Sequence, residues 1–163
     1  MSQDTANKNL CKCTQYSQTF LVTPTKEMEY IHGTATKMTA FIDNSQHSLI
    51  INNGAHYSIV AIDYLDNHFP NLEKQLLPTK AKYFISASGK MKSIGTIMKE
   101  IILPHMKANI RLNPEFVVLE DAHIQGFLLG TDYQRMYGIE IYNTKSRHIT
   151  IGTKKEKEFS LEI

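Results

Sequence analysis

Two apolar runs of the sequence each end at a glycine turn, and the polar residues of these turns are the best-placed candidates for chemistry. Leu49-Ile50-Ile51 is followed by Asn52-Asn53-Gly54-Ala55, and Phe127-Leu128-Leu129 is followed by Gly130-Thr131-Asp132. The first turn carries two amides, which donate and accept hydrogen bonds but take up no proton near neutral pH. The second turn carries a carboxylate, Asp132, for which we predict a role as the cap of a following helical turn rather than as a catalytic acid.

The remaining reactive side chains form no recognisable catalytic or metal-binding pattern. For His56, just past the first turn, we expect a solvated or hydrogen-bonded ring. Ser58 lacks the glycines of a nucleophile elbow, so we predict that it caps the helix that follows. The histidines show no paired spacing, and Cys11 and Cys13 stand one residue apart, which predicts reduced thiols, no metal site and no cofactor. A remnant of a zinc knuckle remains the alternative for the two cysteines.

The composition bounds the class of protein. With 163 residues, 42% of them apolar, the chain can bury one sizeable core, which predicts one folded domain. The net charge of +2 favours neither nucleic acid nor membrane as a partner. No apolar run approaches the roughly 18 residues of a membrane span, and the N-terminus lacks a secretory signal pattern, so we expect an intracellular, cytoplasmic protein. Residues 1–30 are rich in polar side chains and are predicted to form a flexible N-terminal linker, in which Phe20-Leu21-Val22 can supply one strand.

From Thr34 onward, short apolar runs separated by turn residues indicate a β-rich domain spanning 34–163. Apolar residues have helical spacing over 58–69, where the predicted helix ends before Pro70. A helical turn is also predicted over 132–137. Ser88-Gly89-Lys90 lacks the frame of a phosphate-binding loop and predicts the tip of a hairpin. Strands are predicted within residues 36–52, 81–87, 92–103, 111–119, 127–129, 139–143, 148–151 and 159–163. They predict a small, mostly antiparallel β-barrel with one or two short helices.

The order of the two glycine turns, with a hairpin between them, resembles the retropepsin-like aspartic proteases. In that family the first segment is apolar-apolar-Asp-Ser/Thr-Gly-Ala, and the second is apolar-apolar-Gly, which continues x-Asp in retrotransposon members. The resemblance implies an all-β closed barrel with minor helix, a mobile hairpin flap over a cleft, and a site completed by a two-fold homodimer. Segments 68–70, 76–79 and 126–133 resemble fungal LTR-retrotransposon polyproteins in detail. The implied flap residues are Ser86, Ala87, Ser88, Gly89, Lys90 and Met91, and the implied second glycine strand is Leu128, Leu129 and Gly130.

Carried onto this chain, the catalytic Asp of the family falls on Asn52, its Ser/Thr on Asn53, and its Gly and Ala on Gly54 and Ala55. In the family, one Asp from each subunit meets at the two-fold axis, and the pair shares a proton and activates water. Two amides cannot share a proton in this way, and general acid–base catalysis is typically worth about 10²–10⁴-fold. The resemblance therefore implies a protease fold with little or no proteolysis, that is, a pseudoenzyme. Asn53-Gly54 is also prone to deamidation, which would create an acid at the wrong position.

The expected function is that of the aspartic endopeptidase domain of a retrotransposon polyprotein, inactive in this copy. Its ligands would be extended peptide or polyprotein segments that bind as an added strand between the flap and the floor of the cleft. Phe159, Leu161 and Ile163 alternate, and in the family terminal strands of both subunits interleave, so these residues are expected to help build a homodimer.

Several alternatives remain open. Asn52 can reflect drift in a degenerate copy, an engineered replacement or retention for binding. The same fold can serve as a non-catalytic peptide-binding or dimerisation module, and an unrelated small β-barrel binding domain is the third reading. No contact with membranes and no direct binding of nucleic acid are expected.

Overall fold

The computed structural model describes residues 36–79, 81–86, 89–106, 108–152 and 159–163, all within one compact unit, Ala35–Ile163. The predicted linker 1–30, with both cysteines, lies outside the described residues, and so do Ala87 and Ser88 of the predicted flap. None of the helices in the described part of the chain is long and apolar enough to cross a membrane. Within the same residues, no group of three or more His, Cys, Asp or Glu could hold a metal ion.

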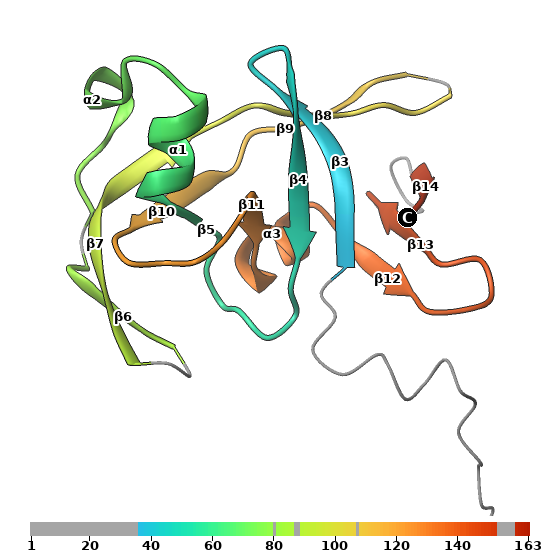
Figure 1. Cartoon of the computed structure of the whole chain (residues 1–163). Coiled ribbons are helices and arrows are strands. Elements are labelled where there is room, and N and C mark those ends of the chain that lie inside the picture. Colours follow the sequence, from blue (N-terminus) through green and yellow to red (C-terminus); the bar gives the residue numbers. More distant parts are fainter. Residues whose placement is uncertain (1–35, 80, 87–88, 107, 153–158) are drawn as a thin grey trace, which may run out of the picture. The chain divides into compact units, whose positions relative to one another are not determined.

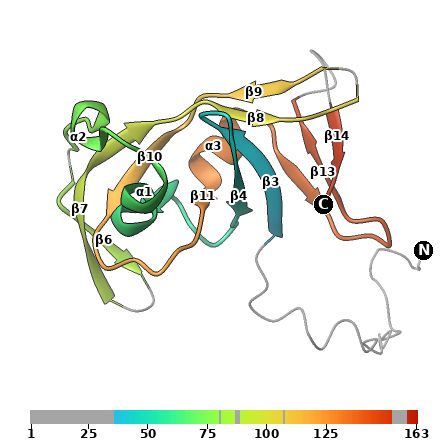
Figure 2. The ribbon, with the colours of Figure 1, turned by 45° about the horizontal axis from the view of Figure 1, so that its top comes forward.

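The domain is built mostly from short strands, as the sequence predicts (Figure 1). A nine-stranded sheet has the order β6-β7-β10-β5-β11-β4-β3-β8-β9, and a three-stranded sheet has the order β12-β13-β14. In both ribbon views the β6–β7 hairpin lies at one end of the domain and β12–β14 at the other (Figure 1, Figure 2). The strands are β3 (Thr36–Ile42), β4 (Ser45–Ile51), β5 (Ile59–Ala61), β6 (Tyr83–Ser86), β7 (Gly89–Met98), β8 (Ile101–Leu103), β9 (Ile110–Leu112), β10 (Glu115–Leu119), β11 (Phe127–Leu129), β12 (Glu140–Tyr142), β13 (His148–Ile151) and β14 (Phe159–Glu162). The helices are α1 (Ile62–His68), α2 (Leu72–Gln75) and α3 (Thr131–Met136).

Two parallel pairings at the centre of the large sheet bring distant parts of the chain together. β11 pairs in parallel with β4, with Phe127 opposite Leu49 and Leu129 opposite Ile51. β10 pairs in parallel with β5, while β11 pairs antiparallel with β5 at Leu128. Because parallel strands end at the same edge of a sheet, the two glycine turns that follow β4 and β11 must lie side by side. The central apolar runs are buried on both faces, which explains why they lack polar alternation.

The helix predicted over 58–69 is partly wrong. Residues Ile59–Ala61 form β5, and the helix α1 begins only at Ile62, with Ala61 rather than Ser58 at its N-cap. The reason is tertiary: these three residues fill the gap between β10 and β11, and the β-branched side chains of Ile59 and Val60 suit a strand. The predicted end of the helix before Pro70 is confirmed, since Phe69 is the C-cap.

A polar cluster is buried beneath α1 at the end of the domain formed by the β3–β4 turn. His47 is only 5% exposed; its Nδ1 lies 2.6 Å from the Tyr64 hydroxyl and its Nε2 lies 2.7 Å from Ser45 Oγ. Its ring stacks on Phe69, with 4.9 Å between centroids. Burial, followed by the nearby His68, lowers the pKa of His47, and burial raises the pKa of Tyr64.

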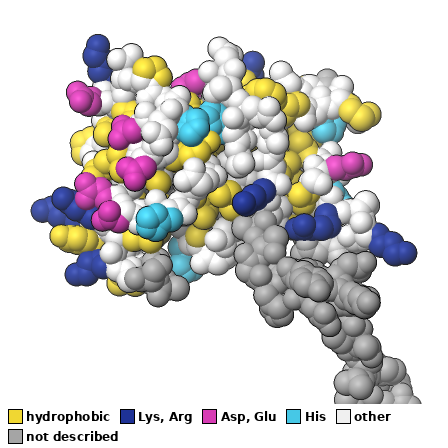
Figure 3. All heavy atoms as spheres, viewed as in Figure 1, with side chains coloured by type: hydrophobic (Ala, Val, Ile, Leu, Met, Phe, Trp, Pro, Cys, Tyr) yellow, Lys and Arg dark blue, Asp and Glu magenta, His cyan; other side chains and the backbone are white. Residues whose placement is uncertain are grey.

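Charged side chains of both signs lie on the described surface. On the face drawn in Figure 3, basic and acidic side chains are interspersed with hydrophobic ones. The charged side chain of Lys99 is buried, at 5% exposure, and its Nζ donates to Asp43 Oδ2 at 2.6 Å and to Gln75 Oε1 at 2.7 Å. Pairing of this kind is what permits a lysine to be buried.

Candidate active site

The first glycine turn is closed by hydrogen bonds made by Asn52. Its backbone N–H donates to the Leu129 carbonyl at 3.2 Å, and its own carbonyl accepts from the Ala55 N–H at 3.4 Å. Its side-chain Oδ1 accepts from the Gly54 N–H at 2.8 Å. This side chain-to-backbone bond over two residues is an Asx turn. Asn52 is therefore held at the end of β4, beside β11, by bonds on both its backbone and its side chain.

The second glycine permits the close approach of the two turns. A Cβ atom on Gly130 would lie 2.5 Å from the Tyr57 carbonyl oxygen and 2.9 Å from the Ala55 carbonyl oxygen, which no side chain could tolerate. The next residue, Thr131, donates its N–H to the Ala55 carbonyl at 2.8 Å. The apolar-apolar-Gly pattern thus reflects a backbone-to-backbone contact across the two turns.

Asp132 and Ser58 lock the turns together. Ser58 is fully buried, and its Oγ donates to Asp132 Oδ1 at 2.9 Å while accepting from the Gly130 N–H at 2.9 Å. Its backbone N–H donates to Asp132 Oδ2 at 3.2 Å. The N-cap residue of α3 is Gly130 and not Asp132, so the prediction that Asp132 caps this helix holds only in part. Asp132 stands in the first turn of α3, where it also accepts the Tyr133 N–H at 2.8 Å, a favourable place for a negative charge.

Gln134 supports the first turn from below. It is 6% exposed, and its Nε2 donates to the Asn52 carbonyl at 3.1 Å and to the Leu129 carbonyl at 2.9 Å. One side chain of α3 therefore holds the ends of both β4 and β11. Gln134 could not be singled out from the sequence, because a glutamine within a helical turn carries no local signal of a contact made 82 residues away.

A cleft of about 410 Å³ opens above the first turn. The β6–β7 hairpin covers one side of it, with Phe84 opposite Met91, and the Tyr57 ring meets the Phe84 ring edge-on at 5.2 Å between centroids. Apart from the backbone, the polar groups of the lining are the amide of Asn52, the imidazole of His56 and the phenol of Tyr57. The lining residues are Asn52, Gly54, Ala55, His56, Tyr57, Ile59, Phe84, Ile85, Met91, Leu119, Ile124 and Leu128.

The cleft unites most, but not all, of the residues singled out from the sequence. Met91 and Leu128 line the cleft, and so do Asn52, Gly54 and Ala55 of the first turn. Asn53, in the same turn, is exposed and does not line the cleft. Leu129 and Gly130 lie behind the floor, where they position it. Ser86 ends β6 and Gly89 begins β7 of the predicted flap hairpin, and Gly89 and Lys90 do not line the cleft.

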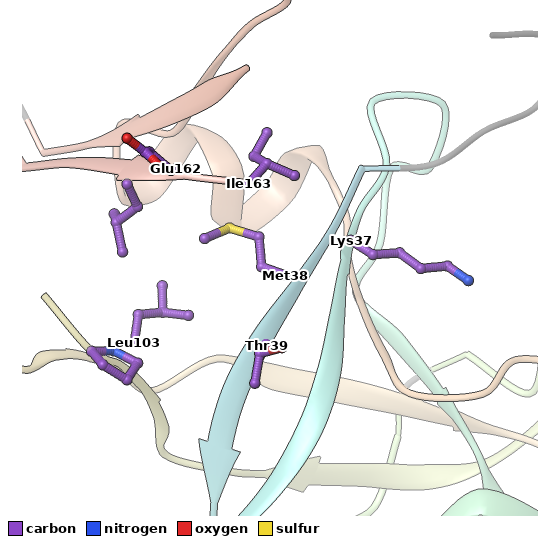
Figure 4. A pocket seen from close by; sticks show the side chains of 8 residues that line it. Lys37, Met38, Thr39, Leu103, Glu162 and Ile163 are labelled. Carbon is purple, nitrogen blue, oxygen red and sulfur yellow. The ribbon is translucent and has the colours of Figure 1, made fainter. Parts of the chain in front are cut away.

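A second, separate groove of about 310 Å³ lies between β3, β8 and β14 (Figure 4). Met38 and Leu103 point into it, and Ile163 closes it from the opposite side, whereas the Lys37 side chain points away (Figure 4). Leu161, on β14, also contributes to its lining. Within the described residues, β14 pairs only with β13 and is an edge strand of its sheet.

The folded chain is similar to solved retropepsin-like domains. The retroviral protease-like domain of Ddi1 from Leishmania major matches with 18% identity and a TM-score of 0.58, over 80% of this chain and 94% of that one. A retropepsin-like aspartic protease from Rickettsia conorii matches with 13% identity and a TM-score of 0.46, over 77% of this chain and 83% of that one. EIAV protease matches with 14% identity and a TM-score of 0.43, over 69% of this chain and 97% of that one. The sequence matches no protein-family model and no curated protein. The first likeness shows that the chain has the retropepsin-like fold.

Proposed function

We propose that this chain is an aspartic protease domain of a retrotransposon polyprotein in which Asn52 stands at the position of the catalytic Asp. The observation that carries the proposal is the setting of Asn52. It follows a buried central strand, lies in a tight turn beside a second glycine turn, and faces a cleft beneath a β-hairpin. This setting agrees with the position that the sequence resemblance implies for the catalytic acid, and it supports the proposal.

The chemistry of the site explains why proteolysis should be lost. Hydrolysis of a peptide bond by this class needs one carboxylate to take a proton from water and another to give a proton to the scissile carbonyl. The Asn52 amide can do neither near neutral pH. Asp132 does not replace it, because its two oxygens already accept hydrogen bonds from Ser58 and from the Tyr133 N–H. The cleft, as described, therefore lacks the pair of carboxylates that would act as general acid and general base.

The site of one chain is half of the working unit, and a homodimer would complete it. Support comes from the groove of Figure 4, where the exposed Ile163 follows the edge strand β14 and lies over an apolar floor that includes Met38 and Leu103. An edge strand beside an apolar groove is suited to pairing with a further strand. In the proposed dimer, the terminal strands of the two copies would bury Ile163, which is 39% exposed in the single chain. The domain would act inside the cell, where a retrotransposon polyprotein is made.

The decisive experiment compares the unaltered chain with Asn52→Asp. Both are incubated with a pool of extended peptides between about pH 4 and pH 7, the range in which a shared-proton dyad acts. We expect cleavage by Asn52→Asp alone. Asn53→Asp is the matched control, since it adds the same charge one residue away, and it should not cleave. Cleavage by the unaltered chain would overturn the proposal.

A second function, peptide binding without cleavage, is favoured by the composition of the cleft. Its walls are apolar, with Ile59, Phe84 and Leu119 among them, and such walls hold the side chains of an extended peptide without any catalytic group. Fluorescence anisotropy with labelled peptides from the same pool measures this binding directly. If Asn52→Asp folds and dimerises but does not cleave, while the unaltered chain binds peptides, this second function is the better account.

A further inference from the structure

The exposed dipeptide Asn53-Gly54 lies on the turn that Asn52 closes, and its chemistry depends on that turn. Asparagine is thermolabile, and its side-chain amide nitrogen is lost most readily when glycine follows, because glycine leaves the next backbone nitrogen unhindered. In this reaction the Gly54 nitrogen attacks Cγ of Asn53. The new N–Cγ bond forms as the Cγ–Nδ2 bond breaks, and Nδ2 leaves as ammonia with the proton from the Gly54 nitrogen. Water then opens the cyclic imide at either carbonyl, which leaves aspartate or isoaspartate at position 53.

The structure places a restraint on the attacking atom. The Gly54 N–H donates to Asn52 Oδ1 at 2.8 Å, so the proton that must be lost is engaged in a hydrogen bond. The Ala55 N–H bonds to the Asn52 carbonyl at 3.4 Å, which closes the turn around Asn53 and Gly54. For attack, the nitrogen must reach about 3–3.5 Å from the reacting carbon with its lone pair aligned. A turn fixed at both Gly54 and Ala55 restricts the rotation that would bring these atoms together.

We propose that position 53 is a latent site of deamidation and that the side chain of Asn52 controls it by holding the Gly54 amide. Asn52 thus has a role that does not depend on proteolysis or on dimerisation. Loss of the bond to Oδ1 exposes Asn53 to modification, and the product carries a new negative charge on an exposed turn at the edge of the cleft. Isoaspartate also adds a methylene group to the backbone of the turn, which lengthens the path between β4 and the cleft.

The rate of modification tests the proposal. The unaltered chain, Asn52→Ala and Asn52→Asp are incubated folded in mildly alkaline buffer, and peptide mapping by mass spectrometry follows the exchange of –NH₂ for –OH at position 53. A neutral hydrogen bond shifts the ratio of bonded to free amide by about twofold to tenfold, so Asn52→Ala should be modified faster by about that factor. Asn52→Asp keeps an acceptor oxygen at the same place and should be modified no faster than the unaltered chain.

Two controls separate this restraint from other effects. In concentrated urea the turn is absent, so all three chains should be modified at one common rate that exceeds the folded rate of the unaltered chain. Asn53→Gln, which would need a larger ring, should show no product in the same peptide. Equal rates for the unaltered chain and a folded Asn52→Ala would overturn the proposal, as would modification of a folded Asn52→Asp at the urea rate. Product at position 52 instead of 53 in the unaltered chain would overturn it too.

Discussion

Replacing Ser58 by alanine should destabilise the domain far more than the loss of one small side chain suggests. The Ser58 hydroxyl is fully buried and makes two hydrogen bonds, one to the Asp132 carboxylate and one from the Gly130 N–H. Hydrogen bonds to charged groups contribute about 1.5–3 kcal/mol, and a buried N–H left without a partner costs about 1–3 kcal/mol. Partial rearrangement offsets some of this loss, so we expect the free energy of unfolding to fall by about 2–5 kcal/mol. That is a large part of the 5–15 kcal/mol typical of a domain.

Urea denaturation at neutral pH, followed by circular dichroism, measures this change as a shift in midpoint at constant slope. Ser160→Ala is the matched control, because Ser160 is exposed on β14 and its loss should change stability by no more than about 0.5 kcal/mol. A double-mutant cycle with Asp132→Asn isolates the contact between the two side chains and should give a coupling energy of about 0.5–3 kcal/mol. A Ser58→Ala variant as stable as the Ser160→Ala control would refute the view that this contact locks the two glycine turns together.

Two further predictions concern the close packing of the turns and the buried histidine. Gly130→Ala should lower the free energy of unfolding by about 3 kcal/mol or more, because its Cβ would lie 2.5 Å from the Tyr57 carbonyl oxygen. Gly89→Ala is the control for backbone strain in thermal denaturation, because its φ is +120° but an added Cβ would meet nothing within 4 Å, and it should cost less than Gly130→Ala. Burial lowers the pKa of His47 in the folded chain, so below about pH 6.5 the unfolded chain takes up a proton that the folded chain does not. Stability should therefore fall with decreasing pH from about 6.5 down to the folded pKa, by at most about 1.4 kcal/mol per pH unit. Urea titrations across this range should show a flatter dependence for His47→Gln, and an unchanged slope would contradict the assignment; His56→Gln, in which an exposed ring is lost, is the control.

Much of the site follows from local pattern, and the rest depends on contacts that no local pattern encodes. The two glycine turns and the hairpin between them were predictable because buried strands are continuous apolar runs and because Gly punctuates turns. The strand β5 was not, since Ile59, Ile62 and Leu65 have the spacing of a helix and a strand of three residues is too short to show a period of its own. Its identity comes from the gap between β10 and β11 that it fills.

The supporting side chains show the same limit. Ser58 and Asp132 are separated by 74 positions, and either residue alone fits a helix cap. The prediction that Ser58 caps a helix is wrong. Its buried hydroxyl instead donates to the Asp132 carboxylate and accepts from the Gly130 N–H. Gln134 offered no signal at all. The residue types of the floor could thus be found from the sequence, whereas the residues that hold the floor in place required the fold.

The parallel pairing of β4 with β11 also has a consequence for the order in which the protein can fold. Leu49 and Phe127 become neighbours only after the whole intervening chain has been made and gathered, so the closure of a long loop precedes any stabilising contact at the site. Folds dominated by such distant pairings fold slowly, in milliseconds to seconds, and expose their strand edges meanwhile. During synthesis, a growing chain that has not yet reached Gln134 cannot close the floor of the cleft. The cleft is therefore among the last features of the domain to form, after the local β3–β4 and β6–β7 hairpins.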